Sequence, residues 1–149
     1  MTETSTEPQP LTPEQLATMT RVGDARLAPD GTAVVFVVDQ ASKDGENEQA
    51  ALWIAPFDST SAGAARQFTS GLANDRAPRW SPDSGRIAFL SDRAERGKSS
   101  VYVMPADGGE GIRVFDQQGE LSGLTWSSDG RYLAVLFTEP ETAEEKKRK

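Results

Sequence analysis

The chain has 149 residues, of which 36% are hydrophobic and 26% are charged, which is typical of one folded domain. Its net charge of −7 disfavours a nucleic-acid partner, because phosphate backbones bind basic surfaces. Cysteine and histidine are absent from the sequence, so we expect no disulfide, no metal, no cofactor and no complete Ser-His-Asp or Cys-His centre in this chain.

The first twenty residues divide into two segments. Residues 1–10 are polar and acidic and lack the basic start and apolar centre of a secretory signal, so we expect a disordered terminus and cytoplasmic residence. Residues 11–20 carry the signals of a short helix, with Thr12 as N-cap, Pro13 at the first helical position and Gln15 three residues after the cap. No apolar run approaches the roughly 18 residues of a membrane helix, so we expect no membrane partner.

From residue 21 onward the sequence repeats itself. When Asp30, Asp83 and Asp129 are aligned, at spacings of 53 and 46 residues, the residue three positions before each aspartate is large and apolar and the next is small. These two columns hold Leu27, Trp80 and Trp126, followed by Ala28, Ser81 and Ser127. An apolar, strand-like run follows each aspartate. Such self-similarity indicates stacked units of one supersecondary structure.

Each unit is predicted to contain four strands. Pro-Asp followed by Gly31 or Ser84 makes a tight turn between a short first strand and a β-branched second strand. Polar loops are expected at 39–50 and 91–100. The expected strands are 26–28, 33–38, 51–55 and 66–68 in the first unit, and 79–81, 86–91, 100–104 and 112–115 in the second. Four strands in each repeat of about 40 to 50 residues indicate the blade of a β-propeller.

The predicted fold is all-β: a partial β-propeller of two four-stranded blades and the start of a third, preceded by the short helix. The blades are placed at 24–70, 76–116 and 121–138, within a propeller region at 21–138, and 139–149 is a charged loop or tail. The large apolar residue of each repeat would pack between neighbouring blades. A closed ring needs about 4 to 8 blades, so we expect a portion of a longer protein, with apolar surface and strand edges exposed.

Arg26 and Arg79 are the candidate functional residues. They share one repeat column beside the packed Leu27 and Trp80, so alternation along a strand should point them away from that packing face. In a propeller they could line the central channel and hold a substrate carboxylate. A wider run of arginines is interpreted either as a positive channel wall or as solvated side chains, and comprises Arg76, Arg79, Arg86, Arg93 and Arg96. The repeated aspartates lie on separate turns and are interpreted as turn residues, not metal ligands.

The motif at 80–93, "WSPDSGRIAFLSDR", resembles the Pro-Asp repeat of the propeller protein TolB and of the prolyl oligopeptidase superfamily. The leader at 11–36, "LTPEQLATMTRVGDARLAPDGTAVVF", is similar to that of the acylaminoacyl-peptidase and dipeptidyl aminopeptidase branch. The second blade at 77–114 and the start of the third at 121–141 are also similar to that branch. The resemblance covers about residues 10–140.

The resemblance implies a cytosolic serine peptidase whose N-terminal propeller covers a C-terminal α/β-hydrolase domain and admits short or N-acylated peptides. The implied partners are the peptide substrate and that hydrolase domain, and a homo-oligomer is an alternative. The chain contains no Gly-x-Ser-x-Gly motif, so it takes over no catalytic residue and would be enzymatic only through its parent protein. The rival interpretation is a TolB-like propeller that acts as a non-catalytic protein-interaction module.

Overall fold

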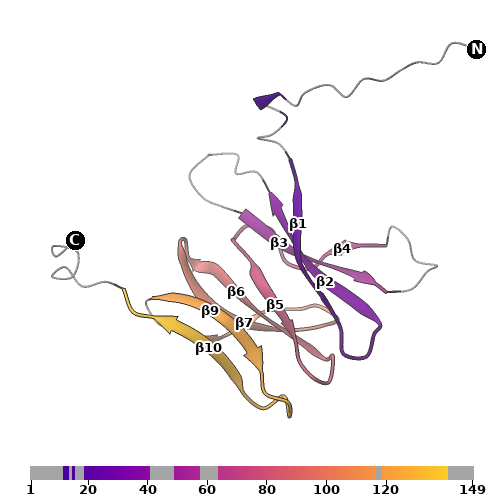
Figure 1. Cartoon of the computed structure of the whole chain (residues 1–149), viewed down its shortest axis with the longest axis vertical. Helices are drawn as coiled ribbons and strands as arrows, with labels where there is room; N and C mark the ends of the chain where they lie inside the picture. Colours follow the sequence, from indigo (N-terminus) through magenta and orange to yellow (C-terminus); the bar gives the residue numbers. More distant parts are fainter. Residues whose placement is uncertain are drawn as a thin grey trace, which may run out of the picture.

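The computed structural model of the protein describes residues 12, 13, 15, 19–40, 49–57, 64–116 and 119–140. Ten antiparallel strands form two four-stranded sheets and one two-stranded sheet, each with its strands in sequence order (Figure 1). Blade 1 contains β1 (Arg21–Leu27), β2 (Ala33–Gln40), β3 (Gln49–Pro56) and β4 (Arg66–Gln67). Blade 2 contains β5 (Arg76–Trp80), β6 (Arg86–Glu95), β7 (Lys98–Pro105) and β8 (Ile112–Phe115). Blade 3 contains β9 (Glu120–Trp126) and β10 (Leu133–Thr138), so the predicted all-β fold is confirmed.

Several strands extend beyond their predicted limits. The first strand of each unit is predicted to be short, but β1 starts at Arg21 and β5 at Arg76, because β1 pairs with β2 as far as Asp39 and β5 pairs with β6 as far as Leu90. At the two ends of the loop predicted at 39–50, β2 continues to Gln40 and β3 begins at Gln49. The segment 91–100 was expected to be a loop, yet β6 continues to Glu95 and β7 begins at Lys98. The sequence did not predict this hairpin because its side chains are polar. Backbone pairing and a turn at Gly97 form it without an apolar pattern.

The predicted helix at 11–20 lies largely outside the described residues. Within it, Thr12 and Gln15 exchange the reciprocal bonds of a capping box. The Thr12 backbone N–H donates to Gln15 Oε1 over 3.0 Å, and the Gln15 N–H donates to Thr12 Oγ1 over 3.2 Å. The helix itself stays a prediction. Among the described residues no helix is long and apolar enough to cross a membrane.

A β-bulge recurs at one column of the repeat. Asp24, Ala77 and Gly123 occupy this column and have positive φ angles of 41°, 53° and 60°. The pairing register shifts around each of them, between β1 and β2, β5 and β6, and β9 and β10. Only Gly123 signals this conformation in the sequence, since left-handed backbone is uncommon for other residues and Ala has no side-chain group to stabilise it. The bulges bend the innermost strands and re-aim their side chains.

Blades 1 and 2 each bury one face against the blade that follows. We name the face that contacts the following blade its forward face and the opposite one its rear face. In blade 1 the forward face carries Val35, Val37, Leu52 and Ile54, and in blade 2 the rear face carries Ile87, Phe89, Tyr102 and Met104. These side chains form one core between blades 1 and 2. Strand alternation separates them from the opposite faces, as expected for a two-sided blade.

The core between blades 2 and 3 uses the opposite face of blade 2. Ala88, Leu90 and Val101 of the blade 2 forward face pack with Leu121 and Leu124 of β9. The rear face of blade 3 contributes Leu133, Val135 and Phe137, which are only partly buried. Successive residues of β6 therefore point alternately to blade 1 and to blade 3, which explains why this strand is a continuous apolar run in the sequence.

The tryptophans of the repeat bind the preceding blade, as the sequence predicted. The Trp80 indole Nε1 donates to the Arg26 carbonyl over 2.9 Å, and Trp126 Nε1 donates to the Arg79 carbonyl over 3.0 Å. At both junctions the donor tryptophan comes from one repeat column and the acceptor arginine from the column just before it. Leu27 does not follow this prediction: it is 51% exposed, because no described strand lies on its side of blade 1. A packed position in this column thus requires a preceding blade.

Replacing Trp126 with phenylalanine is expected to lower the free energy of unfolding by about 1 kcal/mol, because the Arg79 carbonyl loses its donor. Trp53→Phe is the matched control, since Trp53 Nε1 is buried without a hydrogen-bond partner in the described part of the chain. Removing that donor should change stability by no more than about 0.5 kcal/mol. Urea unfolding measures both variants, and equal losses would contradict a specific role for the Trp126 bond.

Candidate functional site

Arg26 and Arg79 meet at one carboxylate on the innermost strands. Arg26 Nη2 lies 2.6 Å from Asp24 Oδ1, and Arg79 Nη1 lies 3.2 Å from Asp24 Oδ2. Arg79 Nη1 also donates to the Pro78 carbonyl over 2.7 Å. The two predicted residues are therefore brought together across the junction of blades 1 and 2, with Asp24 between them.

Sequence reasoning missed Asp24, because its position depends on the bulge. Asp24 is only two residues before Arg26, and in a regular strand both side chains would lie on one face. The left-handed backbone of Asp24 alters the strand path, and its carboxylate contacts both guanidinium groups. Two signals were present in the sequence: the spacing of two residues from Arg26, and a column that holds glycine at Gly123 of the third repeat. Neither indicates the contact with Arg79, which is 55 residues away. Aspartate tolerates this backbone better than most residues.

The cluster of Arg26, Asp24 and Arg79 is partly open to solvent. The side chains are 47%, 29% and 26% exposed, so the ion pairs contribute little to stability. Two cations and one anion leave one net positive charge. Guanidinium groups form bidentate hydrogen bonds with carboxylates, so the cluster has the chemistry to accept a second carboxylate.

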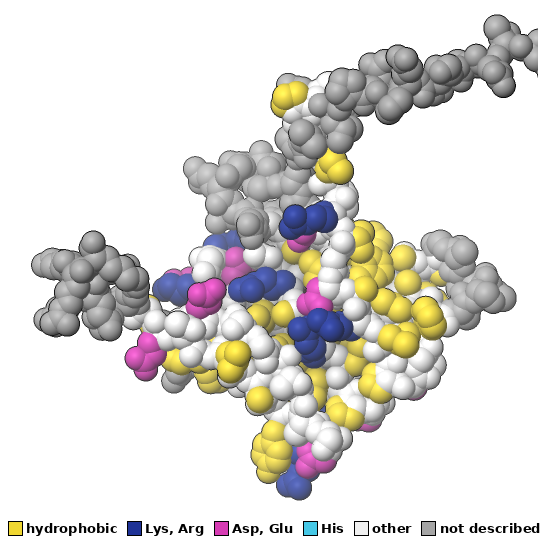
Figure 2. Space-filling view, viewed as in Figure 1, with side chains coloured by type: hydrophobic (Ala, Val, Ile, Leu, Met, Phe, Trp, Pro, Cys, Tyr) yellow, Lys and Arg dark blue, Asp and Glu magenta, His cyan; other side chains and the backbone are white. Residues whose placement is uncertain are grey.

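The wider run of arginines is distributed among separate acceptors. Each of the four remaining residues has a different partner: Arg76 with Ser99 Oγ, Arg86 with the Gly130 carbonyl, Arg93 with Asp75, and Arg96 with Asp92. Acidic and basic side chains also alternate over the face in Figure 2, with no large area of one charge. The structure thus gives these four arginines separate local contacts, and the two interpretations of the run, a positive channel wall or solvated side chains, stay predictions.

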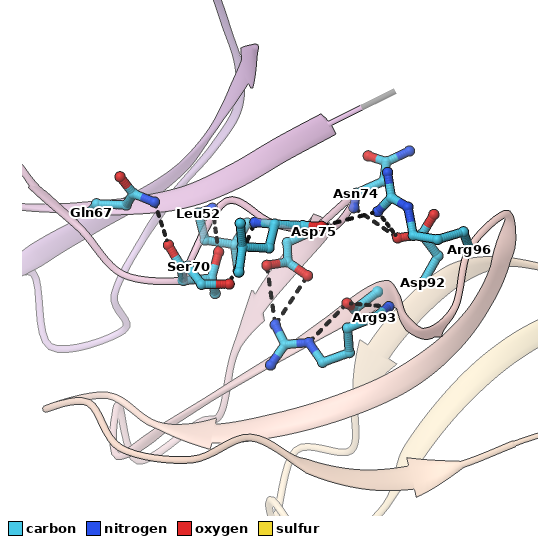
Figure 3. A network of polar contacts seen from close by, with 11 residues as sticks. Leu52, Gln67, Ser70, Asn74, Asp75, Asp92, Arg93 and Arg96 are labelled. Carbon is cyan, nitrogen blue, oxygen red and sulfur yellow. Dashed lines mark hydrogen bonds and ion pairs between the residues drawn. The ribbon is translucent and has the colours of Figure 1, made fainter. Parts of the chain in front are cut away.

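A buried ion pair holds the segment between blades 1 and 2. Asp75 is fully buried, and both of its carboxylate oxygens accept hydrogen bonds from Arg93 Nη2, over 3.0 and 3.1 Å (Figure 3). The Arg93 guanidinium lies 5.0 Å from the Phe89 ring centroid and 4.8 Å from that of Tyr102. The Asp75 backbone N–H donates to the Ala50 carbonyl over 3.0 Å. Asp75 therefore contacts blade 1 through its backbone N–H and blade 2 through its carboxylate.

Asp92 makes a second set of contacts with the same segment. One oxygen accepts from the Asn74 backbone N–H over 2.8 Å and from Arg96 Nη1 over 2.7 Å, and the other accepts from the Gly97 N–H over 2.9 Å (Figure 3). Asp92 and Arg93 stand at the end of the motif at 80–93 that resembles the Pro-Asp repeat. The structure shows that these two side chains fix the crossing between blades.

The repeated aspartates bond their own turns, as predicted. Within each turn the carboxylate accepts from a backbone N–H two residues later, that of Thr32, Gly85 or Arg131. These hydrogen bonds hold the pKa of each aspartate below its ordinary value of 3.8. The leading cause is the Thr32 N–H for Asp30, the Ser81 hydroxyl for Asp83 and the Ser127 hydroxyl for Asp129.

These lowered pKa values predict acid sensitivity. A carboxyl whose pKa is lower in the folded chain stabilises the fold above its unfolded pKa, and this stabilisation is lost as pH falls through the folded pKa. The urea midpoint should therefore fall below about pH 4. The variant Asp83→Asn should show a shallower fall between about pH 5 and pH 2.5, the range around the ordinary aspartate pKa. An unchanged slope in this variant would contradict the assignment.

No protein-family model matches the chain, but individual proteins do. It is 31% identical over 128 residues to the uncharacterized peptidase YuxL of Bacillus subtilis, covering 86% of this chain and 19% of that protein. It is 33% identical over 128 residues to dipeptidyl-peptidase 5 of Porphyromonas gingivalis, covering 86% of this chain and 18% of that protein. The chain thus spans about a fifth of the length of these curated relatives.

Solved structures share the fold. The acylaminoacyl peptidase of Pyrococcus horikoshii matches with a TM-score of 0.63 at 18% identity, over 79% of this chain and 17% of that one. A putative TolB from Agrobacterium tumefaciens matches with a TM-score of 0.61 at 20% identity, over 78% of this chain and 38% of that one. The β-propeller domain of the Trilobed protease from Pyrococcus furiosus matches with a TM-score of 0.60 at 22% identity, over 78% of this chain and 34% of that one.

The sequence matches and the blade architecture agree with each other. The described part of this chain forms four-stranded sheets with their strands in sequence order, and the solved β-propeller domain shares this fold. The chain is therefore a β-propeller portion homologous, over most of its length, to peptidases of the prolyl oligopeptidase family.

Proposed function

We propose that this chain is the substrate-gating propeller portion of a cytosolic serine peptidase that hydrolyses short or N-acylated peptides. The observation that carries the proposal is the sequence match to two peptidases over 86% of the chain. In this proposal an α/β-hydrolase domain elsewhere in the protein transfers the acyl group to its serine and then to water. The propeller restricts which peptides reach that serine.

Within this function, Arg26 and Arg79 hold the carboxylate of a peptide in the channel. Their convergence on Asp24 supports this role, because the cluster keeps one net positive charge and part of its surface open. An incoming carboxylate would share or replace the Asp24 contacts with bidentate guanidinium bonds. The cluster would thereby favour peptides that carry a free carboxylate over amidated ones.

In the proposed peptidase, the double variant Arg26→Ala and Arg79→Ala should lower kcat/KM for free-carboxylate peptides about tenfold, the loss of one charge-assisted hydrogen bond. Amidated versions of the same peptides should change less than about twofold, since they form no such bond. Arg21→Ala is the matched control, because its ion pair with Asp39 is far more exposed. Equal losses on both peptide types would rule out carboxylate recognition.

The peptidase proposal is tested on native protein from the source. A serine-reactive fluorophosphonate probe is added to lysate, and an antibody against residues 76–100 then recovers the protein, whose mass and label are read together. The expected product is a labelled species several times larger than the 16.1 kDa of this chain. An unlabelled species of any size would contradict the proposal.

A second candidate function is a non-catalytic protein-interaction module. The shared fold with a putative TolB, matched over 78% of this chain, favours this second function. The fluorophosphonate experiment separates the two functions, because an interaction module has no serine nucleophile to label.

A further inference from the structure

Aspartate is followed by glycine at four places in the sequence, residues 30–31, 44–45, 107–108 and 129–130. Residues 44 and 45 lie outside the described part of the chain, and each of the other pairs lies in a turn between two strands. The aspartate is exposed at all three of these turns. Glycine has no Cβ, so its backbone nitrogen can approach the carboxyl carbon of the preceding aspartate closely. Each turn therefore holds two groups that can react with each other.

The backbone closes the three turns in the same way. In each, the glycine N–H donates to the carbonyl three residues earlier. The bonds are Gly31 to Ala28 over 2.8 Å, Gly108 to Pro105 over 3.1 Å and Gly130 to Ser127 over 3.0 Å. The glycine nitrogen must leave this bond before it reacts, and this requirement is common to all three turns. What distinguishes the turns is how the aspartate side chain is held.

At two of the turns, hydrogen bonds anchor the aspartate carboxylate. Asp30 Oδ1 accepts from the Thr32 backbone N–H over 3.0 Å and from the Thr32 hydroxyl over 2.8 Å. Asp129 Oδ1 accepts from the Arg131 backbone N–H over 3.1 Å and from the Ser127 hydroxyl over 2.6 Å. Such local bonds hold a carboxylate in one orientation relative to its own backbone. Turning the carboxyl carbon toward the glycine nitrogen must break them, so they oppose the reaction.

The Asp107 carboxylate has no such anchor. Within the part of the chain that the structure describes, its side chain forms no hydrogen bond and no ion pair. Two glycines follow it, and Gly108 and Gly109 have φ angles of 114° and 120°, which residues with a Cβ rarely adopt. A Cβ at either glycine would meet no described atom within 4 Å. The carboxylate and the backbone after it are therefore both free to change their orientation.

We propose that Asp107 is a site of spontaneous isomerisation, at which the Asp107–Gly108 linkage becomes an isoaspartyl linkage. The Gly108 nitrogen forms a bond to the Asp107 carboxyl carbon, and the nitrogen's proton leaves with the carboxyl hydroxyl as water. The resulting cyclic imide then takes up one water at the main-chain carbonyl carbon of Asp107, and the bond from that carbon to the Gly108 nitrogen breaks. One water is lost and one is gained, with no oxidation or reduction.

This modification changes the turn that joins β7 to β8. The backbone then runs through the Asp107 Cβ, and the former main-chain carbonyl becomes a free carboxylate. The neighbouring Ala106 N–H donates to the Gly85 carbonyl over 3.0 Å, which connects this turn to the turn between β5 and β6. The isoaspartyl residue thus arises next to a contact between two turns of blade 2, and it accumulates with the age of the molecule.

The test compares the three aspartates within one protein. The full 149-residue chain is kept folded at neutral pH in water enriched in heavy oxygen and is then digested with trypsin in ordinary water. The peptides 99–113, 27–43 and 114–131 contain Asp107, Asp30 and Asp129, respectively. Electron-transfer fragmentation identifies isoaspartyl residues in each peptide. Asp107 should isomerise at least about tenfold faster than Asp30 or Asp129, because each anchoring hydrogen bond corresponds to a factor of about five. The isomerised peptide should carry heavy oxygen.

Two controls separate the structure from the local sequence. In concentrated urea the three rates should agree within about twofold, because unfolding removes the anchoring bonds. The variant Thr32→Val removes the hydroxyl donor but keeps the backbone N–H, so it should speed isomerisation of Asp30 about fivefold and change Asp107 less than about twofold. Thr32 is exposed, and circular dichroism verifies that the variant is folded. Three results would overturn the proposal: equal rates in the folded chain, an undiminished difference in urea, or an isomerised 99–113 peptide without heavy oxygen.

Discussion

Replacing Arg93 with alanine is expected to lower the free energy of unfolding by about 3 kcal/mol. The reason is that Asp75 is 0% exposed and would keep its carboxylate buried after losing both guanidinium bonds. The guanidinium contacts with the Phe89 and Tyr102 rings would be lost as well. Urea unfolding of the two proteins at neutral pH, followed by circular dichroism, measures the difference.

Two control variants separate the causes of this loss. Arg93→Lys keeps the charge but not the planar guanidinium group, so its loss of unfolding free energy should be about half of that of Arg93→Ala. Arg21→Ala breaks an ion pair whose side chains are 84% and 41% exposed, and it should cost no more than about 0.5 kcal/mol. If Arg93→Ala cost as little as Arg21→Ala, the buried pair would not hold the two blades together.

Replacing Phe89 with alanine should cost about 4 kcal/mol, through lost transfer free energy and a cavity in the core between blades 1 and 2. Phe89 is fully buried and stacks on Tyr102 with ring centroids 6.0 Å apart. The same substitution at Phe57, which is 61% exposed, should change stability by no more than about 0.5 kcal/mol. Urea unfolding measures both variants.

The effects of Phe89→Ala and Arg93→Ala should not add. The Arg93 guanidinium lies over the Phe89 ring, so each substitution removes part of what the other removes. The double variant should therefore lose at least about 0.5 kcal/mol less than the sum of the two single losses. Full additivity would contradict an energetic connection between the buried ion pair and the core.

The architecture followed from the sequence because its signals are local. Pro-Asp turns, apolar runs after them and a large residue before them each depend on a few neighbouring residues, and their repetition identified the blades. Trp80 and Trp126 were assigned to blade junctions on the same basis, and their indole bonds confirm it. Leu27 shows the limit of the repeat, since the same column is exposed where no blade lies beside it.

The candidate site depended on geometry that no local pattern carries. Arg26 and Arg79 could be selected by their column, but the carboxylate between them comes from a bulge, and Asp24 is 55 residues from Arg79. The pairing of Asp75 with Arg93 likewise joins residues 18 positions apart across a blade crossing.

The sequence by itself thus determined the blade type and the strand order, because turns and alternation are properties of short segments. The tertiary structure alone decided which charges meet and which apolar faces are covered. Those contacts arise between blades, where residues distant in the sequence are placed together by backbone bulges and by the packing of one sheet on the next.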